Sequence, residues 1–157
     1  MIMTELTIGS PAPDFTLPRN GEGTVTLSGL RGKAVVLYFY PKDDTSGCTA
    51  EAIDFSALGA EFEAANTVVI GISPDSVKSH DKFAAKHKLS VMLAADEEQK
   101  ALEAYGVWKE KSMYGKKYMG VERTTVLVAP DGTIAEIWNK VKVPGHAQAV
   151  LDAARKL

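Results

Sequence analysis

The chain has 157 residues, of which 45% are hydrophobic and 24% charged, and its formal net charge is -2. This length predicts one domain, residues 1–157, and the balanced charge excludes a broad basic surface for nucleic acid. The first residues, MIMTELTIG, form no signal peptide, and the longest apolar run, residues 34–40, is too short to cross a bilayer. We therefore expect a soluble, cytoplasmic protein with no membrane partner.

The first part of the chain predicts short strands, then a buried strand and a helix. Residues 12–17 and 23–30 have strand-like patterns on either side of the turn PRNGEG. The uninterrupted apolar run KAVVLYFY (33–40) is typical of a strand buried on both faces, and Pro41 ends it. From Cys48 onwards the spacing becomes helical, with one apolar face formed by Ala52, Phe55, Leu58 and Phe62.

The rest of the chain alternates strands and helices and then forms a hairpin. The patterns predict strand 66–73, helix 76–88, strand 91–96, helix 97–106, an irregular loop over 107–122, hairpin strands 123–129 and 133–139, and a final helix over 145–157. Alternation predicts parallel strands with helices on the faces, and the hairpin adds an antiparallel edge. The expected fold is α/β and thioredoxin-like, with a central mixed sheet flanked by helices and an N-terminal β extension.

Cys48 is the only cysteine, and it falls in the first turn of the helix that follows the buried strand. Backbone N–H groups there lack helical partners and carry partial positive charge, which stabilises a thiolate. Loops after the carboxyl ends of parallel strands are also where open α/β sheets bind ligands. A free cysteine is often inert packing, but the polar residues between Pro41 and the sulfur favour a reactive thiol.

The sequence contains no motif for other kinds of cysteine chemistry or for a cofactor site. A single cysteine excludes a disulfide within the chain and argues against a thiolate metal site, while a dithiol motif lacks its second cysteine. We interpret His80, His87 and His146 as ordinary surface or helix histidines, because they match no cysteine-protease signature. No metal, flavin, haem or nucleotide motif is visible, so we expect no cofactor.

The segment FYPKDDTSGCTAEA (39–52) resembles the P-x-x-x-[T/S]-x-x-C active site of peroxiredoxins, in particular the bacterioferritin comigratory protein, or peroxiredoxin Q, subfamily. The resemblance covers nearly the whole chain, including GSPAPDFTLP, FAAKHKL, YGVWKEKSMYGKKYMG and RTTVLVAPDG. It implies a thiol peroxidase that reduces hydrogen peroxide and organic hydroperoxides through a cysteine sulfenic acid. It also implies thioredoxin, a glutaredoxin-type protein or another thiol as reductant, and a monomer or weak dimer.

The same resemblance assigns roles to individual residues. Cys48 is the peroxidatic nucleophile, and Arg123, by itself an ordinary surface charge, lies beside the sulfur and favours the thiolate. Thr45 offers a hydroxyl that holds the thiolate and orients the peroxide, or serves as a helix N-cap. Pro41 shields the thiolate from water, or merely ends a strand. Glu51, about one turn along the helix, supports these groups or is simply a favourable anion near the helix start.

Two positions depart from the subfamily pattern. Ser46 stands where proline is usual. The resolving cysteine of relatives lies five residues after the first, here Ile53, or on the next helix, here Ala84. Either this is a natural one-cysteine enzyme reduced by an outside thiol, or its resolving cysteine was removed. The surroundings of Ala84 resemble relatives with cysteine there, so we favour an engineered replacement by alanine.

Two functions of other classes are weighed against the peroxidase. A peroxide sensor or relay would pass the oxidised state of Cys48 to a partner protein with negligible turnover. A thioredoxin-like binding module would carry an inert thiol. Oxygen uptake by the sulfur separates the binding module from the other two, and steady-state peroxide consumption separates the peroxidase from the sensor.

Overall fold

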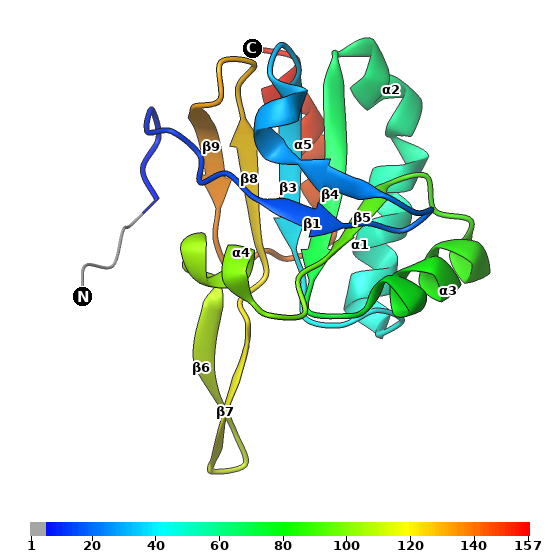
Figure 1. The fold of residues 1–157 in the computed structure, drawn as a ribbon, viewed down its shortest axis with the longest axis vertical. Coiled ribbons are helices and arrows are strands. Elements are labelled where there is room, and N and C mark those ends of the chain that lie inside the picture. The colour runs from blue at the N-terminus through cyan, green and yellow to red at the C-terminus, as the bar shows by residue number, and fades with distance from the viewer. Residues whose placement is uncertain (1–5) are drawn as a thin grey trace.

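A computed structural model describes residues 6–157, and a five-stranded mixed sheet forms its centre (Figure 1). The strand order is β5-β4-β3-β8-β9. Strands β3, β4 and β5 are parallel to one another, and β8 pairs antiparallel with β3 on one side and with β9 on the other. The five strands are β3 (Ala34–Phe39), β4 (Thr67–Ser73), β5 (Met92–Ala95), β8 (Thr124–Val128) and β9 (Ile134–Trp138). This arrangement confirms the predicted mixed sheet with its antiparallel edge.

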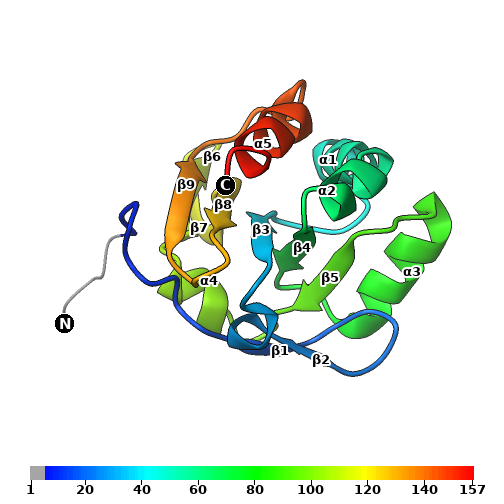
Figure 2. The ribbon, with the colours of Figure 1, turned by 90° about the horizontal axis from the view of Figure 1, so that it is seen from above.

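Layers on both faces of the sheet bury its apolar strands (Figure 2). One face is covered by α1 (Ser46–Ala57), α2 (Gly59–Ala64) and α5 (His146–Ala154). The other face carries α4 (Lys100–Ala104) and the two-stranded sheet of the N-terminal extension, β1 (Thr16–Pro18) and β2 (Thr24–Thr26). Helix α3 (Val77–His87) lies beside the edge strand β5. Successive side chains of β3 alternate between two core clusters, with Val35, Leu37 and Phe39 in one and Val36 and Tyr38 in the other.

The N-terminal β extension is present, although its strands are shorter than the sequence predicts. β1 (Thr16–Pro18) pairs antiparallel with β2 (Thr24–Thr26), and the rest of the second predicted strand is a 3-10 turn, η1 (Leu27–Leu30). Buried side chains from both parts, Leu17, Val25 and Leu27, join the core cluster on this face. None of the helices within residues 6–157 has the length and apolar character that a membrane crossing needs.

The helix predicted after Cys48 is interrupted. α1 ends at Ala57 and α2 begins at Gly59, because Leu58 leaves helical geometry between them (φ -96°, ψ 12°). The predicted apolar face nevertheless holds across the break. Phe55 packs against Phe62 with ring centroids 5.9 Å apart, and it stacks on Tyr38 at 4.7 Å. The periodicity therefore identified the buried side chains correctly but not the break.

The prediction of an irregular loop over 107–122 is wrong. β6 (Trp108–Met113) pairs antiparallel with β7 (Lys116–Val121) in a hairpin that projects from the body (Figure 1). Tyr114 and Gly115 form its two-residue turn with φ of 52° and 77°, the left-handed geometry that matches the twist of paired strands. Most of its side chains are exposed on both faces, so the sequence carries no alternation of apolar and polar residues.

Candidate active site

The topology of the sheet brings two distant segments together at one edge. Cys48 lies in the first turn of α1, which follows the carboxyl end of β3. β8 runs antiparallel to β3, and its first residue, Thr124, pairs with Phe39, the last residue of β3. Arg123 directly precedes β8 and therefore reaches the start of α1.

The Arg123 guanidinium joins the thiol to a carboxylate. Its Nη2 donates to Cys48 Sγ at 3.3 Å, and its Nη1 donates to Glu51 Oε1 at 2.7 Å. Burial lowers the pKa of Arg123, but the negative charges of Glu51 and Cys48 outweigh that effect and raise it above its ordinary value. A side chain at position 47 would crowd this arrangement, because a Cβ on Gly47 would lie 3.3 Å from Arg123 Nη2. The site thus holds a fixed cation against the sulfur.

Cys48 is more buried than its polar sequence neighbours predict. Only 1% of the residue is exposed, and it belongs to the same core cluster as Ala52 and Phe55. The polar residues that precede Cys48 in the sequence suggest an open position, whereas in the structure Cys48 lies at the end of the apolar stripe of the helix. The groups around the sulfur therefore enclose it almost completely.

Glu51 is a buried carboxylate with one satisfied oxygen. The residue is 1% exposed, and no hydrogen-bond partner reaches its Oε2. Burial raises the pKa of Glu51 from 4.5 to about 7, although the Arg123 guanidinium opposes that shift. Burial therefore favours the protonated form of this carboxyl group, and the ion pair with Arg123 favours the ionised form.

We expect Glu51→Gln to remove a pH-dependent part of the stability. The folded chain holds this proton more tightly than the unfolded chain, so the stabilisation is complete below pH 4.5 and is lost as the pH rises through about 7. Between these pH values the free energy of unfolding should fall by roughly 2–3 kcal/mol more in the parent chain than in the variant, as denaturant titrations can measure.

Glu63→Gln, at an exposed position of α2, is the matched control and should keep the pH dependence of the parent chain. Burial, together with Arg123, lowers the pKa of His146 from 6.5 to about 4. That histidine contributes stability above pH 6.5 that is lost as the pH falls, but it does so in all three proteins and cancels in the comparison. The same slope in the parent chain and in Glu51→Gln would contradict the expectation.

The remaining predicted site residues are Thr45 at the start of α1, Pro41 just after β3, and Ala84 on α3. Thr45 occupies the N-cap position of α1 with extended backbone, but its exposed hydroxyl donates to the Lys42 carbonyl at 2.9 Å instead of capping the helix. Thr45 is thus the N-cap residue, as its alternative interpretation has it, but its side chain makes no capping hydrogen bond. Pro41 is half-buried and follows Tyr40, whose N–H makes the last bond to β4. Ala84 is half-buried on α3 and packs against the same core cluster as Cys48.

Two of the three histidines are buried, which corrects their interpretation as ordinary surface or helix residues. His80 is 0% exposed and His146 is 8% exposed. His146 lies 2.8 Å from the Thr125 hydroxyl, and its ring packs edge-on against Phe55 and Trp138. The sequence concealed this burial, because a polar residue in a polar stretch becomes an interior residue only when distant segments supply its partners.

One group of ligand-type side chains within residues 6–157 is close enough to hold a cation. The ligand atoms of Asp43, Asp75 and His80 lie within 4.8 Å of one another. All three side chains are already engaged in hydrogen bonds, chiefly within this group and with neighbouring serines. A metal ion would have to replace those bonds.

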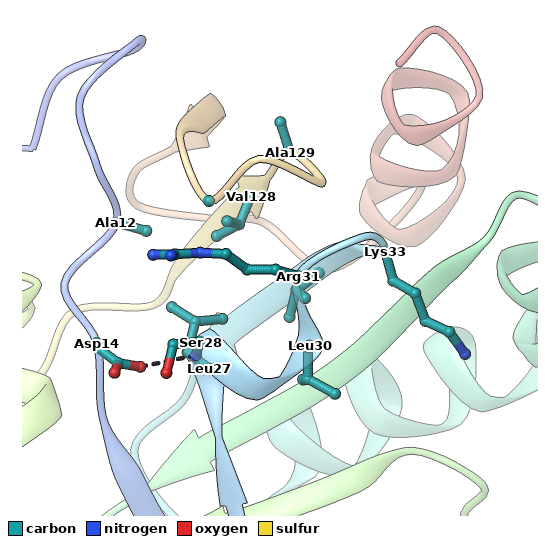
Figure 3. Close-up of a pocket in the computed structure, with 11 residues that line it drawn as sticks. Ala12, Asp14, Leu27, Ser28, Leu30, Arg31, Lys33, Val128 and Ala129 are labelled. Carbon is teal, nitrogen blue, oxygen red and sulfur yellow. Dashed lines mark hydrogen bonds between the residues drawn. The ribbon is translucent and has the colours of Figure 1, made fainter.

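A small pocket lies at the opposite end of the sheet (Figure 3). It is lined by residues near the start of β3 and the end of β8, including Val35 and Val128, whereas Cys48 follows the end of β3. The Arg31 side chain extends across it, and its volume of about 10 Å³ corresponds to roughly one water molecule. The pocket is too small for a substrate, and it is not part of the site around Cys48.

Comparison with known proteins identifies the family. The AhpC/TSA family model matches residues 8–137. Peroxiredoxin Bcp of Xanthomonas campestris is 46% identical over 155 residues, covering 98% of this chain and 97% of that protein. Peroxiredoxin Bcp of Bacillus subtilis is 46% identical over 150 residues, covering 96% of each.

A solved structure leads to the same family. The bacterioferritin comigratory protein of Xanthomonas campestris superposes with a TM-score of 0.90 at 44% identity, over 96% of this chain and 98% of that one. This similarity confirms the predicted thioredoxin-like fold and the resemblance read from the sequence. The chain therefore belongs to the AhpC/TSA family and is a peroxiredoxin of the Bcp, or peroxiredoxin Q, type.

Proposed function

We propose that this chain is a thiol peroxidase that reduces hydrogen peroxide and organic hydroperoxides, with Cys48 as its nucleophile. The observation that carries the proposal is the contact of 3.3 Å between the Arg123 guanidinium and Cys48 Sγ in the first turn of a helix. A thiolate at that place is stabilised by unpaired N–H groups and by a fixed cation. The related Xanthomonas protein is described for its alkyl peroxide reduction activity, which supports a peroxide substrate.

The reaction begins with attack of the Cys48 thiolate on one peroxide oxygen. An S–O bond forms and the O–O bond breaks, and the departing oxygen takes a proton and leaves as water or an alcohol. Arg123 stabilises the negative charge that develops on the peroxide oxygens. The Thr45 hydroxyl leaves the Lys42 carbonyl and donates to the peroxide, while Pro41 limits the access of water to the thiolate. Cys48 ends as a sulfenic acid.

An outside thiol completes the cycle, because the chain has no second cysteine. Thiolate attack on the sulfenic sulfur expels water and forms a mixed disulfide, and a further thiol then releases Cys48 in its reduced form. Thioredoxin or a glutaredoxin-type protein supplies both thiols from one dithiol. We place this cycle in the cytoplasm, where thiols are kept reduced, and expect a single-domain protein that acts as a monomer or weak dimer.

The proposal is tested by following the sulfur and the turnover together. After a slight excess of peroxide, intact mass should show one added oxygen on Cys48, and a thiol reductant should then sustain peroxide consumption. A chain that takes up oxygen but does not turn over would be a sensor or relay. If no oxygen is added, Cys48 is inert and the peroxidase proposal fails.

We expect Ala84→Cys to restore an internal disulfide with Cys48 after peroxide treatment. Both positions adjoin the same core cluster, but a bridge needs Cα atoms within about 7 Å, so the first turn of α1 has to unwind. Peptide mass mapping should find the crosslink, and amide exchange over 45–53 should become faster in the oxidised variant.

Ala85→Cys, at the exposed neighbouring position of α3, is the matched control and should stay free. Free thiols at position 84 in the oxidised protein would show that this site does not take the role of a resolving cysteine.

A further inference from the structure

A buried acidic side chain, Asp43, anchors the loop between β3 and α1 to helix α3. Asp43 is 7% exposed, and its two oxygens face three side chains. Tyr40 donates its hydroxyl to Oδ1 at 2.5 Å, and Ser79 donates its hydroxyl to Oδ2 at 2.8 Å. His80 Nδ1 lies 2.7 Å from the same Oδ2. Two of these partners belong to α3, so Asp43 fastens the loop to that helix.

Both ring nitrogens of His80 have a hydrogen-bond partner. Nε2 lies 3.0 Å from the Ala94 carbonyl, which only accepts, so Nε2 carries a proton. Nδ1 faces Asp43 Oδ2, and the Tyr40 hydroxyl lies 3.4 Å from the same nitrogen. With 0% of His80 exposed, the ring and the Asp43 carboxyl group form a hydrogen-bonded pair that water does not reach.

Further bonds fix the backbone on either side of this pair. The N–H of Asp43 donates to Asp75 Oδ2 at 2.8 Å. Asp44 has a left-handed backbone (φ 59°), and its carboxylate lies 2.6 Å from Lys86 Nζ and 2.9 Å from His87 Nε2. α1 begins two residues later, so this loop sets where the first-turn N–H groups stand around the Cys48 sulfur.

We propose that His80 is a positioning residue for the peroxidase reaction: it holds the Asp43 carboxylate and, through it, the loop that aims the start of α1 at Arg123. This inference rests on the proposed peroxidase function. His80 touches neither the sulfur nor the peroxide. Loss of His80 should slow the oxidation of Cys48, because the sulfur, the helix N-terminus and the guanidinium would no longer be correctly placed relative to one another. Small misplacements of reacting groups lower the reaction rate strongly.

Two substitutions of His80 test its two hydrogen bonds, to Asp43 and to the Ala94 carbonyl, one at a time. The amide nitrogen of asparagine lies near the place of Nδ1, so His80→Asn keeps the bond to Asp43 and gives up the Ala94 carbonyl. The longer glutamine reaches the place of Nε2, so His80→Gln keeps the Ala94 carbonyl and gives up Asp43. Both variants remove the ring and lose one of its two hydrogen bonds, so a general loss of packing should affect them alike.

The measurement is the single-turnover rate of Cys48 oxidation by hydrogen peroxide, in proteins whose folding is verified by circular dichroism. His80→Gln should react about tenfold to a hundredfold more slowly than the parent chain, and His80→Asn should stay within about threefold. Equal rates in the two variants, whether both normal or both slow, would overturn the proposal. A parent chain that does not react would instead refute the peroxidase function.

Amide exchange over residues 43–48 tests the positioning without reference to activity. Exchange should be faster in His80→Gln than in His80→Asn, and equal exchange would refute the role of the Asp43 contact. If neither variant folds, Ser79→Ala removes one donor to Asp43 and should also speed exchange in this segment. Lys82→Gln, at an exposed position of α3, is its control, and equal exchange in these two proteins would likewise count against the proposal.

Discussion

Replacing Cys48 by serine is expected to reduce peroxide consumption to the uncatalysed rate, a fall of more than about 10,000-fold. The reaction needs an ionised sulfur that attacks oxygen, and a serine hydroxyl is neither ionised at neutral pH nor able to form a sulfenic acid. The measurement is steady-state peroxide consumption with a thiol reductant, together with intact mass after peroxide.

The serine variant should keep the fold, since its smaller oxygen occupies a site that is 1% exposed and can still accept a hydrogen bond from Arg123. Its thermal midpoint should stay within roughly 5 °C of the parent value. Ser46→Ala, in the same first turn but exposed, is the control for disturbance of the helix start and should keep most of the activity. Turnover that survives in the Cys48 variant would place the chemistry on another residue.

Arg123→Ala is expected to slow the oxidation of Cys48 by about 100-fold to 1,000-fold, the usual cost of removing one charge-stabilising donor. The substitution takes away the guanidinium that lies 3.3 Å from the sulfur, so both the thiolate and the departing oxygen lose their cation. Arg123→Lys keeps a charge but cannot reach Glu51 and Cys48 together, and we expect an intermediate rate. The rate of Cys48 alkylation as a function of pH reports the ionised fraction directly.

The ion pair with Glu51 makes a double-mutant cycle informative. Glu51 loses its partner in Arg123→Ala, and a buried carboxylate without a cation takes up a proton instead. If the guanidinium acts on the sulfur itself, Arg123→Ala should slow oxidation by a similar factor in the parent chain and in Glu51→Gln. An effect that disappears in the Glu51→Gln background would show that Arg123 matters only as the partner of Glu51. Unchanged alkylation in Arg123→Ala would remove it from the mechanism.

Local patterns were sufficient for most of the fold. The run from Ala34 to Phe39 is apolar without interruption because layers cover both faces of the central sheet, and a strand in that position has no polar side. The helical face after Cys48 was found because Phe55 and Phe62 have to meet the same core, even though the helix breaks at Leu58. The hairpin over 108–121 was missed for the converse reason, since it buries little and leaves no pattern.

The candidate site was less accessible to the same reasoning. The position of Cys48 at a helix start is a local fact, but its contact with Arg123 joins residues 75 positions apart. The burial of Glu51 raises its pKa to about 7 against the opposing effect of Arg123, and that burial depends on the packing around α1. Asp43 and His80 lie in stretches of polar residues that read as solvated, and only their mutual contact makes them interior.

Local patterns predict most of the elements in their order, the buried faces and a thiol at the start of a helix, because periodicity and helix-end chemistry act between near neighbours. Which charged groups meet depends on the packing of distant segments. Strand β8 runs antiparallel beside β3 and so brings Arg123 into contact with the Cys48 sulfur. Helix α3 packs against the loop after β3 and so brings His80 into contact with Asp43 in the interior. Such pairings depend on sheet topology, since a charge is stabilised in the interior only by the partner that the fold brings to it.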